Sequence, residues 1–169
     1  MHKKMKKKFL SLWTGEFTAT ILFALVWMQY LALFEWADSY LSSFSTLYAF
    51  ALLEFILLQG SYYWFLKWKQ LKRKDYSHLS YGQLRLFSWF KKMNLFLIGI
   101  GFLVLIYQVI VFPLEFYWFL FLYLFAIIEY INYYHIRLSY LTMDEIKEFI
   151  RQKGFRSSKL AKELKFFNK

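Results

Sequence analysis

Residues 47–56 read Leu47-Tyr48-Ala49-Phe50-Ala51-Leu52-Leu53-Glu54-Phe55-Ile56, and residues 122–131 read Leu122-Tyr123-Leu124-Phe125-Ala126-Ile127-Ile128-Glu129-Tyr130-Ile131. Six of the ten positions are identical. Both stretches lie within long apolar segments, and each places one carboxylate, Glu54 or Glu129, among hydrocarbon side chains. We interpret the match as an internal repeat. Chance similarity in a chain rich in Leu, Phe, Tyr and Ile is the alternative.

The composition indicates an all-α integral membrane protein. The chain has 169 residues, of which 59% are hydrophobic, and a soluble domain of this size could not bury so much apolar surface. There is no cysteine, which excludes disulfides, thiol nucleophiles and Cys-ligated metals. The 25% aromatic content suits interfacial belts at both faces of a bilayer. Richness in Lys, Phe, Tyr and Ile is typical of an AT-rich bacterial genome.

Four segments are long and apolar enough to span a bilayer, which takes about 20 residues. They are residues 17–34, 44–66, 94–112 and 116–134. The first follows a basic run, as a signal peptide would, but its apolar part is longer than a usual signal peptide's and no small-x-small cleavage motif follows it. We therefore expect this segment to be retained as a transmembrane helix.

The charges predict the orientation of these segments. All 22 Lys and Arg residues lie before the first span, between the second and third, or after the fourth. The other two connections carry only acidic charges, at Glu35, Asp38 and Glu115. Because basic connections stay in the cytoplasm, we expect a multi-pass plasma-membrane protein with both termini inside.

The predicted architecture is two helical hairpins that point the same way, so the repeat would be parallel, about an axis normal to the membrane. Pro113 suits the second outer turn because it ends a helix without leaving an unpaired donor. The predicted segments are a basic N-terminus (1–16), a first hairpin (17–66), a basic amphipathic loop (67–93), a second hairpin (94–134) and a basic amphipathic tail (135–169).

Glu54 and Glu129 are the first candidates for a binding site, since ionisable groups inside a membrane are costly and often functional. At similar depth they could not both be ionised in a dry core unless a cation lay between them. The alternative is that each bonds a neighbouring helix and only ties the bundle together. The other predicted intramembrane polar binding residues are Asn132, His135, Gln59, Gln29 and Gln108.

Glu129, Asn132 and His135 follow one another at steps of three residues, which places neighbours side by side along a drifting helical stripe. Such a stripe could relay protons. For His135 we favour the simpler interpretation of a polar group at the membrane boundary. The spacing of Glu129 and His135 does not match a metal motif, and we expect no metal and no cofactor. We expect Gln29 and Gln108 to form interhelical hydrogen bonds.

The loop 67–93 begins with a basic cluster and continues as what we expect to be a short interfacial helix. The cluster can bind anionic phospholipids, although holding the topology alone would also explain it. Its members are Lys67, Lys69, Lys72, Arg73 and Lys74.

The tail predicts two amphipathic helices. Thr142-Met143-Asp144-Glu145 is a capping-box pattern for the first, and Ser157 or Ser158 can cap the second, with Leu160 and Leu164 on its apolar face. Since the soluble part of the chain is too small for a core, we expect the tail to lie on the membrane or on a partner. Nucleic acid is not favoured, because basic charge alone is non-specific.

The segments Glu129-Tyr130-Ile131-Asn132-Tyr133-Tyr134-His135 and Ser157-Ser158-Lys159-Leu160-Ala161-Lys162-Glu163-Leu164 resemble a group of small four-span membrane proteins of low-GC Gram-positive bacteria. The resemblance covers only the C-terminal part of the chain. It implies a four-span fold and no particular activity.

The sequence holds no phosphate-binding Gly-rich loop, GxSxG or HExxH motif. We therefore expect a non-enzymatic protein that acts by binding, as an accessory or regulatory subunit or an immunity-type protein of a membrane complex. Its partner would be a membrane protein or a second copy. One alternative is a small transporter or channel that uses Glu54 and Glu129 for protons or cations. Another is an enzyme acting on lipid headgroups with His135, Asn132 and Glu129.

Overall fold

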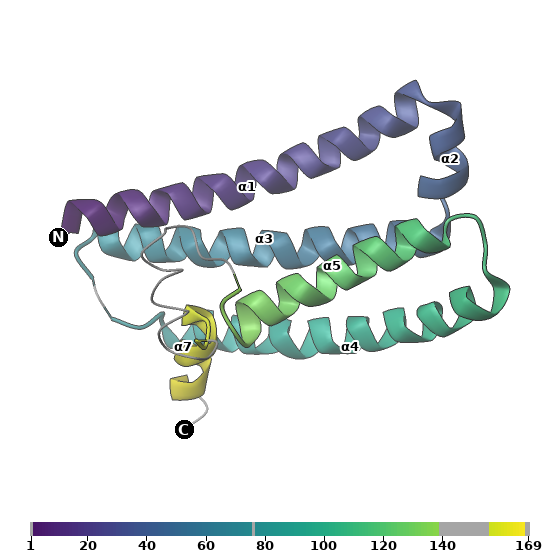
Figure 1. Ribbon diagram of the computed structural model, residues 1–169. Coiled ribbons are helices and arrows are strands. Elements are labelled where there is room, and N and C mark those ends of the chain that lie inside the picture. The colour runs from purple at the N-terminus through teal and green to yellow at the C-terminus, as the bar shows by residue number, and fades with distance from the viewer. Residues whose placement is uncertain (1, 76, 139–155, 168–169) are drawn as a thin grey trace.

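The computed structural model describes residues 2–75, 77–138 and 156–167, and in these ranges the regular elements are helices. Four of them are long and apolar enough to cross a membrane, which confirms the predicted all-helical class and the predicted number of such helices. The helices are α1 (His2–Leu33), α2 (Glu35–Leu41), α3 (Phe44–Lys72), α4 (Tyr81–Val111), α5 (Phe116–Tyr134) and α7 (Lys159–Phe167) (Figure 1).

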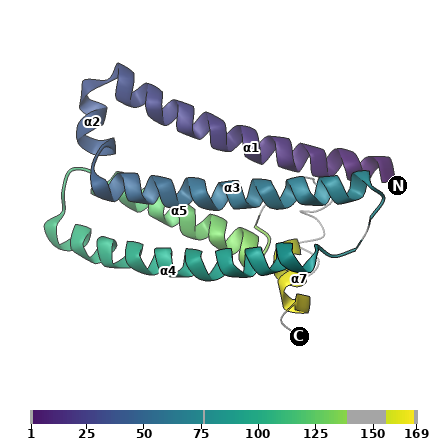
Figure 2. The same cartoon turned by 180° about the vertical axis from the view of Figure 1, so that it is seen from behind.

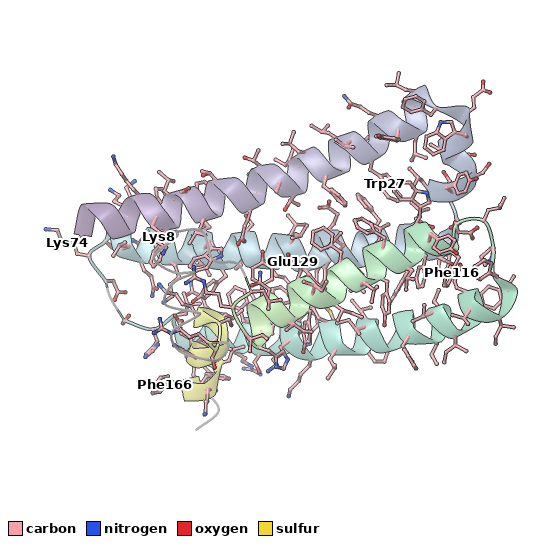
Figure 3. The ribbon with its side chains drawn as sticks, in the orientation of Figure 1. Lys8, Trp27, Lys74, Phe116, Glu129 and Phe166 are labelled. Carbon is pink, nitrogen blue, oxygen red and sulfur yellow. The ribbon has the colours of Figure 1, made fainter. Side chains whose placement is uncertain are left out.

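The long helices form two hairpins with their turns at the same end of the bundle. α1 and α3 are joined there through α2, and α4 and α5 through residues 112–115 (Figures 1 and 2). The N-terminus, the connection 73–80 and α7 lie at the opposite end. We call this opposite end the basic end, because Lys8 and Lys74 lie there, far from Phe116 (Figure 3).

Local signals explain where the helices begin and end. The Ser43 side chain accepts a hydrogen bond from the Thr46 N–H (3.3 Å) at the start of α3. At the start of α4, Gln83 Oε1 accepts from the Ser80 N–H (3.1 Å), as in a capping box. α4 ends where Phe112 takes a left-handed conformation (φ 48°) just before Pro113.

Residues 81–93 are the first turns of α4 and not a separate interfacial helix, so that prediction was wrong. α3 continues to Lys72 and α4 begins at Tyr81, which leaves only residues 73–80 as the connection. The physical reason is that no proline interrupts the chain between the Ser80 start signal and Pro113. The short helix α2 in the other connection was not predicted.

α3 is the central helix and packs along both α1 and α5. α1 diverges from α3 toward α2 (Figure 1). Aromatic rings of the two helices pack against each other. Trp27 stacks on Phe50 with ring centroids 4.2 Å apart, and Phe23 also contacts Phe50. On the other side of α3, a Cβ at Gly60 would overlap the ring of Tyr133. The absence of a side chain at Gly60 therefore lets α5 approach closely.

A buried cluster of polar side chains joins three of the long helices. Gln59 of α3 and Asn94 of α4 exchange two side-chain hydrogen bonds (3.1 and 2.7 Å), and the Tyr134 hydroxyl of α5 donates to Gln59 Oε1 (2.6 Å). All three side chains are buried. In an apolar environment such groups need protein partners, and these three provide them for one another.

The matched tyrosines of the two repeated stretches contact the same helix. Tyr48 of α3 donates to the Leu97 carbonyl (2.6 Å) and Tyr123 of α5 to the Ile98 carbonyl (2.7 Å). The stretches themselves lie on helices that pack against each other. A symmetric internal repeat stays a prediction.

The predicted second tail helix is α7, and Ser158 caps it by accepting from the Ala161 N–H (2.9 Å). Its apolar residues Leu160 and Leu164 are buried in the core of this chain, against α4 and α5. The expectation that this face needs the membrane or a partner was therefore wrong. The first tail helix, predicted to begin near residue 142, lies outside the described residues.

Replacing Gln59 should destabilise the bundle. We expect Gln59→Leu to lower the free energy of unfolding in detergent micelles by about 1–2 kcal/mol, because Asn94 would lose its partner. The double variant Gln59→Leu/Asn94→Leu should lose less than the sum of the single variants. Gln29→Leu is the matched control, since Gln29 is exposed. An equal loss for Gln29→Leu and Gln59→Leu would contradict this role.

Candidate functional site

The structure does not join the two predicted glutamates. Glu54 of α3 is half-buried, and its Oε1 atom has no hydrogen-bond partner. Glu129 of α5 accepts a hydrogen bond from Asn132 Nδ2 (3.2 Å) and interacts electrostatically with Glu16 of α1. Glu16 thus takes the place expected for Glu54.

Only part of the polar stripe predicted on α5 is present in the structure. Asn132 contacts Glu129 and also accepts from the Leu138 N–H (2.9 Å), so it fastens the end of α5. His135 is exposed and its ring contacts Tyr130. Desolvation and the charge of Lys91 lower the pKa of His135. These contacts put His135 at the end of the helix, apart from the Glu129–Asn132 pair.

The three predicted glutamines have different environments. Gln59 belongs to the buried cluster with Asn94 and Tyr134. Gln108 is buried on α4 with neither side-chain atom hydrogen-bonded, whereas Gln29 is exposed on α1. Gln29 and Gln108 therefore form no hydrogen bond with each other.

The basic cluster after α3 is divided between two roles. Lys67 forms an ion pair with Glu163 of α7 (2.6 Å), and its side chain is only 11% exposed. It is therefore engaged inside the chain rather than offered to lipid headgroups. The remaining predicted lipid contacts, Lys69, Lys72, Arg73 and Lys74, are exposed.

A cavity of about 270 Å³ lies at the basic end, between α1, α3, the end of α5 and the start of α7. Three basic side chains, one carboxylate, several hydroxyl and amide groups and four large apolar side chains line it. They are Lys8, Phe9, Leu12 and Glu16 of α1; Tyr63 and Trp64 of α3; Asn132, Tyr133 and Arg137 in and after α5; and Ser158, Lys159 and Leu160 at the start of α7.

Backbone pairing closes one wall of this cavity. The Arg137 N–H donates to the Arg156 carbonyl (2.8 Å) and the Ser158 N–H to the His135 carbonyl (3.1 Å). The Ser158 hydroxyl also donates to the Tyr133 carbonyl. These bonds hold the start of α7 against the end of α5.

The inner part of the cavity is acidic and aromatic. Glu16 interacts with the Tyr133 hydroxyl and the Trp64 indole, and its Oε2 atom is buried without a hydrogen-bond partner. Tyr133 reaches this position because Gly60 leaves room for its ring.

Lys159 holds its ammonium over aromatic rings. The Nζ atom lies 4.1 Å from the ring centroid of Phe9 and 5.9 Å from that of Trp64. Although the residue as a whole is exposed, desolvation of this ammonium and the neighbouring charges of Lys67 and Lys8 lower the pKa of Lys159 to about 8.

Glu163 fastens α7 to the rest of the basic end. Its carboxylate pairs with Lys67, accepts from the Tyr63 hydroxyl (3.2 Å) and accepts from the Leu79 N–H (3.1 Å). Glu163 is buried. One side chain therefore links α7 to α3 and to the residues before α4.

The sequence predictions missed Glu16, Lys159 and Glu163. Signals for two of them were present: Glu163 lies three residues after Leu160, on the apolar face of its helix, and Glu16 adjoins the apolar segment that begins at Phe17. An acidic residue in either position needs a partner. No local pattern pointed to Lys159.

Within the described ranges, no group of three or more His, Cys, Asp or Glu side chains could hold a metal ion. No known protein family, characterised protein or solved structure matches the chain. The class of protein therefore follows from the described helices alone: it is an all-α protein, and four of these helices are long and apolar enough to cross a membrane.

Removing the charge of Glu163 should loosen α7. We expect Glu163→Gln to lower the free energy of unfolding by about 2 kcal/mol, because Lys67 would keep a largely buried charge without its counter-charge. Limited chymotrypsin digestion, whose cleavage sites neither substitution alters, should then cleave the C-terminal segment faster than in the wild type. Lys165→Gln changes an exposed side chain of the same helix and should leave the rate unchanged. Equal cleavage rates in both variants would refute the role of Glu163 in holding α7 against the bundle.

The lowered pKa of Lys159 should be visible as reactivity. Only the neutral amine attacks an acylating reagent, so labelling of Lys159 should rise through about pH 8. An ordinary lysine titrates near 10.4. Mass spectrometry of labelled peptides between pH 6 and 10 measures this profile. A rise confined to the ordinary range would show that the ammonium is fully hydrated.

Proposed function

We propose that this is a multi-pass plasma-membrane protein with both termini in the cytoplasm. We further propose that it acts by binding, as an accessory or regulatory subunit or an immunity-type protein of a membrane complex. The binding site would be the cavity at the basic end. The observation that carries this proposal is that four separate segments of the chain assemble this cavity.

The distribution of ionisable groups supports binding over transport. The halves of α1, α4 and α5 that lie away from the basic end contain no Asp, Glu, Lys, Arg or His, and the corresponding half of α3 contains one such residue, Glu54. Glu16 and Glu129 are grouped toward the basic end, and Glu54 is not hydrogen-bonded to either. A path for ions needs polar groups through the whole bilayer, whereas a site open at one end suits a bound ligand.

The outward face of α1 supports a partner within the membrane. Gly15, Thr18, Ala19 and Gln29 are exposed on this helix, and a Cβ at Gly15 would meet no atom within 4 Å. Small residues let a second helix approach closely, and a lipid-facing amide gains from a hydrogen bond with it. The partner in this proposal is a membrane protein or a second copy of the chain.

Filling the cavity should abolish binding. We expect protein isolated from native membranes in lipid nanodiscs to retain a bound partner or small molecule, detected by native mass spectrometry. Leu12→Trp places a larger side chain in the cavity wall and should remove that species. Leu10→Trp is the matched control, because Leu10 lies on the same helix but is exposed. Identical bound species in the wild type and both variants would refute a binding role for the cavity.

A further inference from the structure

We propose that the cavity at the basic end binds a phosphate-bearing anion, with the Lys159 ammonium as its main contact and Lys8 and Arg137 beside it. This inference rests on the proposed function, because it names the ligand class of the same cavity. The phosphate could belong to a lipid headgroup or to a soluble phosphate monoester.

The first argument is the excess of positive charge. Lys8, Arg137 and Lys159 line the cavity, together with a single carboxylate, that of Glu16. Lys159 experiences unfavourable interactions with Lys67, Lys8 and Arg137. Bringing an anion between such charges relieves their mutual repulsion.

The second argument is that the acidic group that attracts Lys159, Glu163, is already engaged. Glu163 pairs with Lys67 at 2.6 Å and also accepts from Tyr63 and Leu79. Lys159 instead contacts the rings of Phe9 and Trp64. Lys8 and Arg137 have interactions of their own, so the proposal depends on Lys159.

The third argument is the position of α7. Its first turn, from Ser158 to Leu160, lines the cavity. The N-terminus of a helix carries partial positive charge and favours anions, phosphate in particular. This charge adds to that of the Lys159 side chain at the same place.

The fourth argument concerns orientation. Glu16 lies two helical turns further along α1 than Lys8, so the cavity has a cationic rim and an acidic inner end. A phosphate is attracted to the rim and repelled from Glu16. Phe9, Leu12 and Trp64 line the space between them, which suits the apolar part of an amphiphilic ligand.

The lipid arm of the test compares wild type with Lys159→Gln and Lys165→Gln. Each protein is placed in phosphatidylcholine nanodiscs with a minor fraction of phosphatidylglycerol, and native mass spectrometry counts the phosphatidylglycerol retained. We expect Lys159→Gln to weaken retention about tenfold, as for loss of a charge-assisted hydrogen bond. Lys165→Gln removes the same charge from a position of α7 that does not line the cavity and should change retention less than twofold.

The soluble arm uses pure phosphatidylcholine nanodiscs titrated with inorganic phosphate or glycerol 3-phosphate. An increase in thermal stability that occurs in the wild type and in Lys165→Gln but not in Lys159→Gln would assign a soluble phosphate. Selective loss in the lipid arm alone would assign a headgroup. Either result supports the proposal.

The proposal is overturned if Lys159→Gln and Lys165→Gln behave alike in both arms. The Leu12→Trp variant then separates two failures. If Leu12→Trp still removes a bound species while Lys159→Gln does not, the cavity binds a ligand that is not a phosphate. If neither variant changes what is bound, the proposed function fails as well.

Discussion

The hydrogen bonds among Gln59, Asn94 and Tyr134 are the interaction on which the rest of the structure depends. Between apolar helices surrounded by lipid, packing alone does not specify register, because one apolar surface is much like another. A buried amide that must find a partner specifies both the neighbour and the depth at which it is met. This cluster joins α3 to α4 and α5, and α1 packs along α3.

The same requirement organises the basic end. Glu163 is buried only because Lys67, Tyr63 and Leu79 satisfy its carboxylate, and this brings α7 against the bundle. The start of α7 then becomes a wall of the cavity, with Lys159 directed over Phe9 and Trp64. The attachment of α7 and the formation of the proposed site therefore have one physical cause, the pairing of a buried charge.

The molecule is strongly asymmetric between its two ends. Aromatic contacts such as that of Trp27 with Phe50 lie toward the end at which the hairpins turn, whereas hydrogen bonds and ion pairs hold the basic end. The ionisable groups of Glu16, Lys67 and Glu163, which are costly to bury, lie toward the basic end and have protein partners there. This arrangement is what favours a binding role over passage through the membrane in our proposal.

The sequence by itself determined the all-helical class and the number of long apolar helices, because hydropathy and capping are local properties. The range predicted for the fourth span, 116–134, is the range of α5. Only the tertiary structure decided that Glu129 faces Glu16 and not Glu54, that α7 is covered by its own chain, and that a cavity forms. These outcomes depend on contacts such as Tyr63 with Glu163, which lie 100 residues apart. No local pattern encodes such a pair, because its stabilisation appears only when distant segments exclude water together.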